Sequence, residues 1–208
     1  MASSNVSSFI QRVGQGVKPN MFMVDVNFPG SLSKSADDLE TTNIMCKSAA
    51  LPGSNLGVIE VPFRGRTVKI AGDRTFDTWT VTFFNDKDFK LRAFFEQWAN
   101  NINTHEANTS PLFTPNNTTG YTADLKVKQL EKDASTTGVI LREYTLFYCF
   151  PTNVSQIDLA YDSNDQIEEF TVEWQYSYFK AEGGERSGVS STVSYTHIRA
   201  HETTLDLV

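Results

Sequence analysis

Alternating apolar and polar residues recur in short runs along the chain, and this period of two predicts β-strands. The clearest run covers residues 166–179, where two sets of side chains point to opposite sides of the expected strand. The apolar set is Phe170, Val172, Trp174, Tyr176 and Tyr178, and the polar set is Glu169, Thr171, Glu173, Gln175 and Ser177. One face is therefore expected in the core and the other in polar surroundings. Similar runs predict strands over residues 21–27, 44–51, 58–63, 67–70, 78–84, 121–130, 139–150 and 154–159.

One helix is predicted, over residues 87–102, with Asn85 or Asp86 as its N-cap. Its apolar residues recur at helical spacing and form a single stripe. They are Phe89, Leu91, Phe94, Phe95, Trp98 and Ile102. Residues 29–43, rich in Ser and Asp, and the polar residues 103–120 are predicted to be loops.

A hairpin is predicted where residues 58–63 and 67–70 flank Arg64-Gly65-Arg66, because glycine suits the tip of a tight turn. Its flanks are apolar: Val58, Ile59, Val61, Phe63, Val68 and Ile70. Such a hairpin is not expected to stand in water, since it would expose an aggregation-prone patch. An internal hairpin of the sheet is the alternative interpretation.

The pattern divides the chain into three parts. Residues 1–20 are small and polar and predict an N-terminal arm with about one helical turn. Residues 21–180 hold the predicted strands and helix and are expected to form one domain. Residues 181–208 begin like a linker and do not continue the alternation. They are interpreted as a translated cloning read-through outside the fold, with a native, flexible C-terminal arm as the alternative.

Composition narrows the class of protein. The 208 residues carry 18 Lys and Arg against 25 Asp and Glu, giving a net charge of −7, which disfavours a fold made to grip nucleic acid. The aromatic share of 12% agrees with strands. No apolar run reaches the length of about 18 residues that a membrane span needs, and the N-terminus does not resemble a signal peptide.

Candidate chemistry is sparse. Cys46 and Cys149 lie in apolar runs and are expected to be buried free thiols, and the three histidines are not spaced as metal ligands. Glu168 and Glu169 are neighbours in a predicted strand, so they point to opposite faces and cannot act as a catalytic pair. We therefore expect neither an enzyme nor a bound cofactor or metal.

Several segments resemble the tail tube proteins of contractile-tailed bacteriophages. The resemblance rests on residues 68–81 (VKIAGDRTFDTWTV), 150–154 (FPTNV), 157–159 (IDL) and 164–172 (NDQIEEFTV), with support from residues 18–22 (KPNMF) and 46–52 (CKSAALP). The order and spacing of these segments agree from about residue 9 to residue 179. The range 29–43 is longer than expected for the family.

The resemblance implies a mainly β fold, a barrel or sandwich flanked by one α-helix, with a protruding hairpin and an N-terminal arm. Subunits would form hexameric rings that stack into a tube inside a contractile sheath. The protein would then be a structural part of the virion, assembled in the host cytoplasm. Its partners would be itself, the tail sheath protein, and the baseplate and tail terminator proteins. The tape measure protein and genomic DNA would pass through the lumen without specific binding.

Placed in such a ring, the polar face of residues 166–179 would line the lumen and keep it acidic, so that phosphates are repelled. The residues expected there are Thr78, Thr80, Thr82, Glu169, Thr171, Glu173 and Gln175. The hairpin would dock one ring on the next. The residues expected at this junction are Val58, Ile59, Val61, Phe63, Arg64, Arg66, Val68, Ile70, Asp73 and Arg74. Lys126 and Lys128 share the polar side of the strand over residues 121–130 with Thr122 and Asp124, and their surface stays open at this point.

Two alternatives use the same fold: a tube protein of a related contractile injection or type VI secretion system, and a baseplate protein that initiates the tube. A neighbouring sheath gene with capsid genes nearby would favour the phage. A sugar-binding β-sandwich of the virion is a third possibility. It would need exposed tryptophans, whereas Trp79, Trp98 and Trp174 all fall on core-facing stripes.

Overall fold

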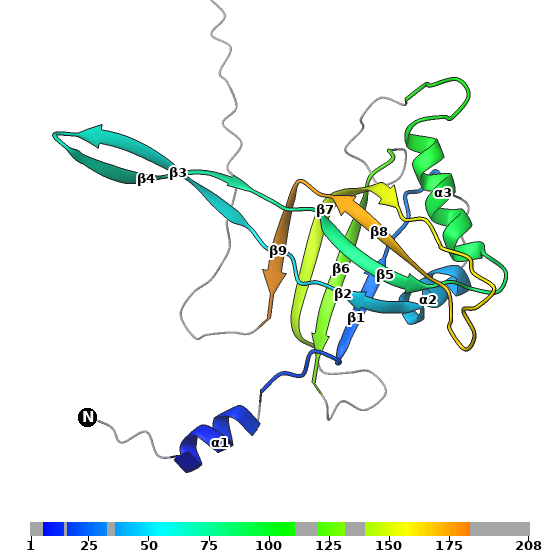
Figure 1. The fold of residues 1–208 in the computed structure, drawn as a ribbon, viewed down its shortest axis with the longest axis horizontal. Coiled ribbons are helices and arrows are strands. Elements are labelled where there is room, and N and C mark those ends of the chain that lie inside the picture. Colours follow the sequence, from blue (N-terminus) through cyan, green and yellow to red (C-terminus); the bar gives the residue numbers. More distant parts are fainter. Residues whose placement is uncertain (1–5, 15, 33–35, 111–119, 132–139, 184–208) are drawn as a thin grey trace, which may run out of the picture.

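Strands dominate the computed structural model, which describes residues 6–14, 16–32, 36–110, 120–131 and 140–183. The strands are β1 (Phe22–Val26), β2 (Cys46–Ala49), β3 (Asn55–Phe63), β4 (Arg66–Thr75), β5 (Trp79–Phe84), β6 (Ala123–Leu130), β7 (Ile140–Val154), β8 (Glu169–Gln175) and β9 (Tyr178–Glu182). The helices are α1 (Val6–Gly14), α2 (Ala36–Ile44) and α3 (Lys90–Ile102). The prediction of a mainly β fold with a flanking helix is confirmed (Figure 1).

The sheet is built around β7, its longest strand. The strand order is β1-β6-β7-β8-β5-β2, all antiparallel, and β9 also pairs with β7. The first part of β7 pairs with β6 and β9, and its last residues pair with β8. Between these parts Tyr148 has a positive φ of 58°, and its N–H donates to Asp124 Oδ1 at 3.1 Å. Such an irregularity bends a strand, which lets β7 contribute to both halves of the sheet.

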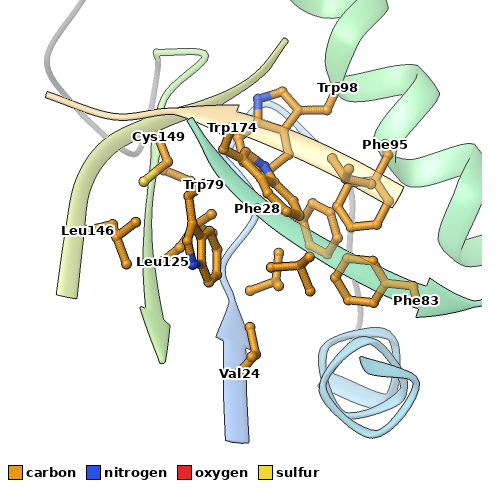
Figure 2. Close-up of a cluster of buried hydrophobic side chains, with 14 of the residues drawn as sticks. Val24, Phe28, Trp79, Phe83, Phe95, Trp98, Leu125, Leu146, Cys149 and Trp174 are labelled. Atoms are coloured by element: carbon orange, nitrogen blue, oxygen red, sulfur yellow. The ribbon is translucent and has the colours of Figure 1, made fainter. Parts of the chain in front are cut away.

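The core lies between the apolar faces of these halves and α3 (Figure 2). Register places Trp79 opposite Trp174 and Phe83 opposite Phe170, so four aromatic rings gather on one face of β5 and β8. Phe95 of α3 packs onto them, with its ring 5.3 Å from that of Phe83. The other half of the sheet contributes Val24, Val26, Leu125, Val127 and Leu146. The alternation in the sequence is thus the direct cause of the core.

The sheet does not close into a barrel within one chain. In the described residues β1 pairs only with β6, and β2 pairs only with β5, so each keeps an unpaired edge. The barrel expected from the resemblance is therefore open in the monomer. Unpaired edges are a liability unless something covers them.

Two predictions about helices were wrong: one helix was missed, and the start of another was placed too early. Residues 36–44 form α2 and not the predicted loop. The sequence did not indicate this helix, because the range has too few apolar residues to give a helical stripe. Helix α3 begins at Lys90 and not at residue 87. Asp86 instead receives the Asp88 N–H at 3.0 Å in a turn, and the N-cap is Phe89 in a left-handed conformation, with no side-chain cap.

The strand predictions also needed correction. Pro151 does not end β7, which continues to Val154, because the register shifts beside Pro151 and a bulge tolerates its missing N–H. Residues 155–168 therefore connect β7 to β8, and residues 155–159 of the strand predicted over 154–159 form no strand. The run 166–179 is two strands, β8 and β9. After Tyr176 the alternation changes phase, so that Phe179 and not Tyr178 packs against the core.

Candidate assembly interface

The hairpin β3–β4 extends away from the sheet as a long two-stranded arm (Figure 1). Its turn is Arg64-Gly65, where φ is 47° and 79°. Two consecutive positive φ values are typical of a type I′ turn, whose twist matches that of the flanking strands. The predicted hairpin is confirmed, and it is longer than the sequence indicated because both strands continue to Asn55 and Thr75.

Register gives this hairpin two different faces. One face carries Ile59 opposite Ile70, Val61 opposite Val68, and Phe63 opposite Arg66. We call Ile59, Val61, Phe63, Val68 and Ile70 the apolar hairpin face; these side chains are 42–62% exposed. The other face carries Glu60 opposite Lys69, an ion pair of 3.4 Å. The arm is thus amphipathic, and its apolar side is not covered by the described residues of its own chain.

The structure separates the residues that were predicted to act together at the ring junction. Val58 lies opposite Ala71, on the polar side of the hairpin. Asp73 and Arg74 lie at the base of the arm, beyond a bulge, far along the strand from the tip. There the backbones of Gly57 and Gly72 come so close that a Cβ on Gly72 would lie 3.1 Å from the Gly57 carbonyl carbon. Arg74 Nη1 donates to Ser54 Oγ at 3.4 Å within its own chain.

A second surface is the outer face of β5 and β8. Register places Thr80 opposite Glu173 and Thr82 opposite Thr171. The hydroxyls of Thr82 and Thr171 lie 3.3 Å apart, and Gln175 Nε2 donates to Thr78 Oγ1 at 2.9 Å. Together with Glu169 these residues form what we call the polar face: Thr78, Thr80, Thr82, Glu169, Thr171, Glu173 and Gln175. The structure brings this predicted set onto one side of the sheet.

Lys47 changes the charge of the polar face, and the sequence analysis missed it. Its ammonium forms an ion pair with Glu169 and lies 5.8 Å from the ring centroid of Phe84. Among the described residues Glu173 forms no ion pair. The unbalanced charge of this surface is therefore one carboxylate per chain. Alternation could not have indicated it, because period two groups Lys47 with the apolar Met45, Ala49 and Leu51, and the register of β2 shifts between Cys46 and Ser48.

Lys126 and Lys128 belong to a different surface, on the outer side of β1, β6 and β7. Lys126 Nζ donates to Glu143 Oε1 at 2.7 Å, and Lys128 pairs with Asp25. The hydrogen bond to Glu143 is the largest cause that raises the pKa of Lys126. Thr122, expected beside them, is instead fully buried. This surface is neutralised by its own pairs, so it does not contribute to the charge of the polar face.

Both cysteines are free thiols. Cys149 is buried and Cys46 is partly buried, and desolvation raises the pKa of each thiol to about 12. The described residues hold no group of three potential metal ligands, and none of their helices is long and apolar enough to span a membrane.

Two further apolar sets are exposed in the structure. Helix α1 shows Val6, Phe9, Ile10 and Val13 on one exposed stripe. The connection from β7 to β8 exposes Leu159, Tyr161 and Ile167. Their exposure could not be predicted from the sequence, because single exposed apolar residues are common and only the fold shows which ones stay uncovered.

Comparison with known proteins decides the family. The family model described as "Phage tail tube protein" matches residues 17–182, most of the chain. The chain belongs to the phage tail tube protein family. The "Tail tube protein gp19" of Enterobacteria phage T4 is 32% identical over 167 residues, covering 80% of this chain and 93% of that protein.

Solved structures share the tail tube fold at lower identity. The cryo-EM structure of the anti-feeding prophage baseplate, 6-fold symmetrised, contains a chain with a TM-score of 0.56 and 14% identity, covering 78% of this chain and 93% of that one. A chain in the sheath–tube complex of the extracellular contractile injection system PVC has a TM-score of 0.54 and 18% identity, covering 86% and 99%. At these identities the likeness concerns the fold alone.

Proposed function

We propose that this chain is the repeating subunit of the tail tube of a contractile-tailed bacteriophage, assembled as hexameric rings that stack inside a sheath. The observation that carries the proposal is the 32% identity to the T4 tail tube protein along 93% of that protein. The fold likeness to a chain of a 6-fold symmetrised baseplate agrees with a hexamer. The lower identity of 18% to the injection-system chain favours a phage tail over a secretion tube.

The open edges of the sheet support ring formation. Strands β1 and β2 lie at opposite ends of the strand order, and each has one unpaired side in the described residues. An edge that meets the opposite edge of a neighbour makes a heterologous contact, which closes into a ring when the rotation allows it. Closure would turn the open monomer sheets into one continuous barrel and remove the exposed edges.

The apolar hairpin face supports stacking of one ring on the next. Its five side chains are about half exposed, and burying the remainder would contribute about 1 kcal/mol each, half of the value for full burial. A stacking contact repeats around the ring and continues from ring to ring without closing. Of the residues expected at this junction, we place the apolar hairpin face, Arg64 and Arg66 at the contact, and keep Val58, Asp73 and Arg74 at its margin.

The polar face supports a lumen that does not hold DNA. Its threonines and Gln175 offer neutral surface, and Glu173 adds an unpaired negative charge that would repeat around a ring. Phosphates meet no net positive charge there, so DNA and the tape measure protein could slide through without specific binding.

The proposed role in a virion tail tube also assigns the parts of the chain, its partners and its place of assembly. Residues 1–20 would be an arm. The tube domain, expected over residues 21–180, would extend to Glu182, where β9 ends, and residues 184–208, which lie outside the described residues, would be a dispensable tail. The sheath would surround the tube, with baseplate and terminator proteins at its two ends. Assembly would take place in the host cytoplasm, where the tail is built.

Size-exclusion chromatography and negative-stain microscopy of the purified chain test the proposal. We expect particles larger than one ring and tubes of uniform width but variable length, because stacking has no built-in end. A chain that stays monomeric at every concentration tested would contradict the proposed function.

A further inference from the structure

The hairpin and the connection between β7 and β8 lie at opposite ends of the molecule (Figure 1). We call residues 155–168 the β7–β8 connection; in Figure 1 it runs beside α3, away from the hairpin. If the hairpin docks on the next ring, some surface of the next subunit must receive it. A receiving surface at the opposite end would let each subunit bind the next in the same orientation, so the contact would propagate.

The tip of the hairpin combines cations with an apolar side chain. The guanidinium of Arg64 lies 5.3 Å from the centroid of the Phe63 ring, and Arg66 lies opposite Phe63 in the ladder. Among the described residues neither arginine forms an ion pair, whereas Lys69, further from the tip, is paired with Glu60. The surface that receives the tip should therefore offer carboxylates next to apolar groups.

The β7–β8 connection has this composition. Its sequence holds Asp158, Asp162, Asp165 and Glu168 and no Lys, Arg or His. In the part of the chain that the structure describes, none of these four carboxylates forms an ion pair. Between them Leu159 is 79% exposed, and Tyr161 is fully exposed. Asp158 accepts a hydrogen bond from Gln156 Nε2 and Glu168 one from Asn85 Nδ2, so both keep their negative charge without a cation. Acids without an ion-pair partner beside exposed apolar side chains complement the hairpin tip in both charge and polarity.

The connection is also held in place, which a docking surface requires. Arg92 of α3 donates from Nη1 to the Ser155 carbonyl oxygen at 3.0 Å. The Thr171 N–H donates to Ser155 Oγ at 2.8 Å, and Ile157 packs against the core. The exposed residues thus project from an anchored segment, and their ordering cost on binding is reduced.

The apolar stripe of α1 is the competing receiver, and charge argues against it. Residues 1–20 contain Arg12 and Lys18 but no Asp or Glu, so this arm offers no carboxylate to the arginines of the hairpin tip. A basic arm against a basic tip would juxtapose like charges, which is unfavourable.

We infer that the β7–β8 connection of one subunit receives the hairpin tip of a subunit in the neighbouring ring, with Asp158 and Asp162 facing Arg64 and Arg66 and with Leu159 and Tyr161 against the apolar hairpin face. This inference rests on the proposed function, since it names the partner surface of the stacking hairpin.

Charge reversal on the two sides tests the pairing. R64E/R66E and D158K/D162K should each shorten tubes about tenfold, because each places like charges together. A chain that carries all four substitutions should regain tubes. Mixing the two double variants should do the same, since each supplies the complement of the other. The matched control is E106K/E131K, which makes the same charge change at exposed positions outside the connection and should leave tube length unchanged.

If a charge variant folds poorly, disulfide cross-linking tests which surface receives the hairpin tip. Chains with R66C and D162C, oxidised by diamide after assembly, should give ladders of linked subunits on non-reducing gels. The native thiols contribute little background, because burial raises the pKa of both to about 12. The comparison chain carries R66C with F9C on α1 and should give no ladder.

The outcomes separate the inference from the proposed function. Loss of tubes in R64E/R66E together with normal tubes in D158K/D162K, or ladders through F9C and not D162C, would overturn the inference and leave the tube subunit standing. Failure of the unmodified chain to form tubes would contradict both.

Discussion

At the residue scale, two phenylalanines illustrate two roles, one in the core and one at a proposed assembly contact. Phe95 is completely buried and touches the rings of Phe83, Phe170 and Trp174. Phe63 is 62% exposed near the tip of the hairpin. The same side chain therefore has a folding role in one place and, in our proposal, a binding role in the other.

Alanine at these two positions should separate folding from assembly. F95A should lower the free energy of unfolding by about 3–5 kcal/mol, because it leaves a cavity among aromatic rings. F63A should change it by less than about 0.5 kcal/mol, since little is buried there, yet it should weaken tube formation. Denaturant unfolding at low protein concentration and sedimentation at high concentration measure the two effects. Normal tubes from folded F63A would show that the hairpin tip is not at the junction.

Glu173 is the second residue whose role depends on its surroundings. Lys47 neutralises Glu169, so Glu173 alone sets the charge of the polar face. Tubes of the unmodified chain should not retain duplex DNA on filters at low salt. E173K should create salt-sensitive retention, because it places a cation where phosphates pass. E131K, the same change at an exposed position outside the polar face, is the control. Tight retention by the unmodified tubes would contradict an acidic lumen.

At the scale of elements, the sequence predicted the strands in which apolar and polar residues alternate regularly. The strands β1, β5 and β6 agree with prediction to within about two residues, because each has one face in the core and a regular period. The hairpin was found from its turn and its apolar flanks. The polar face could be predicted as one surface, because period two fixes which side chains share a side.

The errors fall where long-range contacts override local signals. Pro151 marks the end of a strand by local rules, yet β8 holds it inside β7 at a bulge. Residues 36–44 carry no apolar stripe, and α2 instead packs beside β1, where Asn43 Oδ1 accepts the Val26 N–H at 3.1 Å. Alternation could not place Lys47 on the correct face, because the register of β2 shifts between Cys46 and Ser48, and its pairing with Glu169 depends on the order of strands.

Strand β9 is the last element that the structure describes. Glu182, its last residue, pairs with Glu143 of β7, and the family match ends at the same position. A chain truncated after Gly183 keeps every described ladder and should retain the thermal midpoint and tube formation of the full chain. Thermal unfolding and micrographs of the truncated chain test this. Loss of tubes would show that residues 184–208 are a working arm.

At the scale of the whole molecule, the surfaces proposed for assembly lie at its two ends and at the two edges of its sheet. The hairpin extends from one end, and the β7–β8 connection lies at the other (Figure 1). Within the described residues, β1 and β2 terminate the sheet, each with one side that pairs with no strand. In our proposal, contacts at the two ends produce growth along an axis, and contacts at the two edges produce closure around it. In the described residues of a monomer the two ends and the outer side of β2 have no partner strand, and at the edge of β1 Asn43 Oδ1 of α2 accepts the Val26 N–H. We therefore propose the assembled tube as the functional state.

A cryo-EM reconstruction of tubes grown from the purified chain tests this account most directly. It predicts hexameric rings, Thr80 and Glu173 lining the bore, and each hairpin crossing to the adjacent ring. Rings of another symmetry, a bore lined by the Lys126 surface, or hairpins that end in solvent would contradict it.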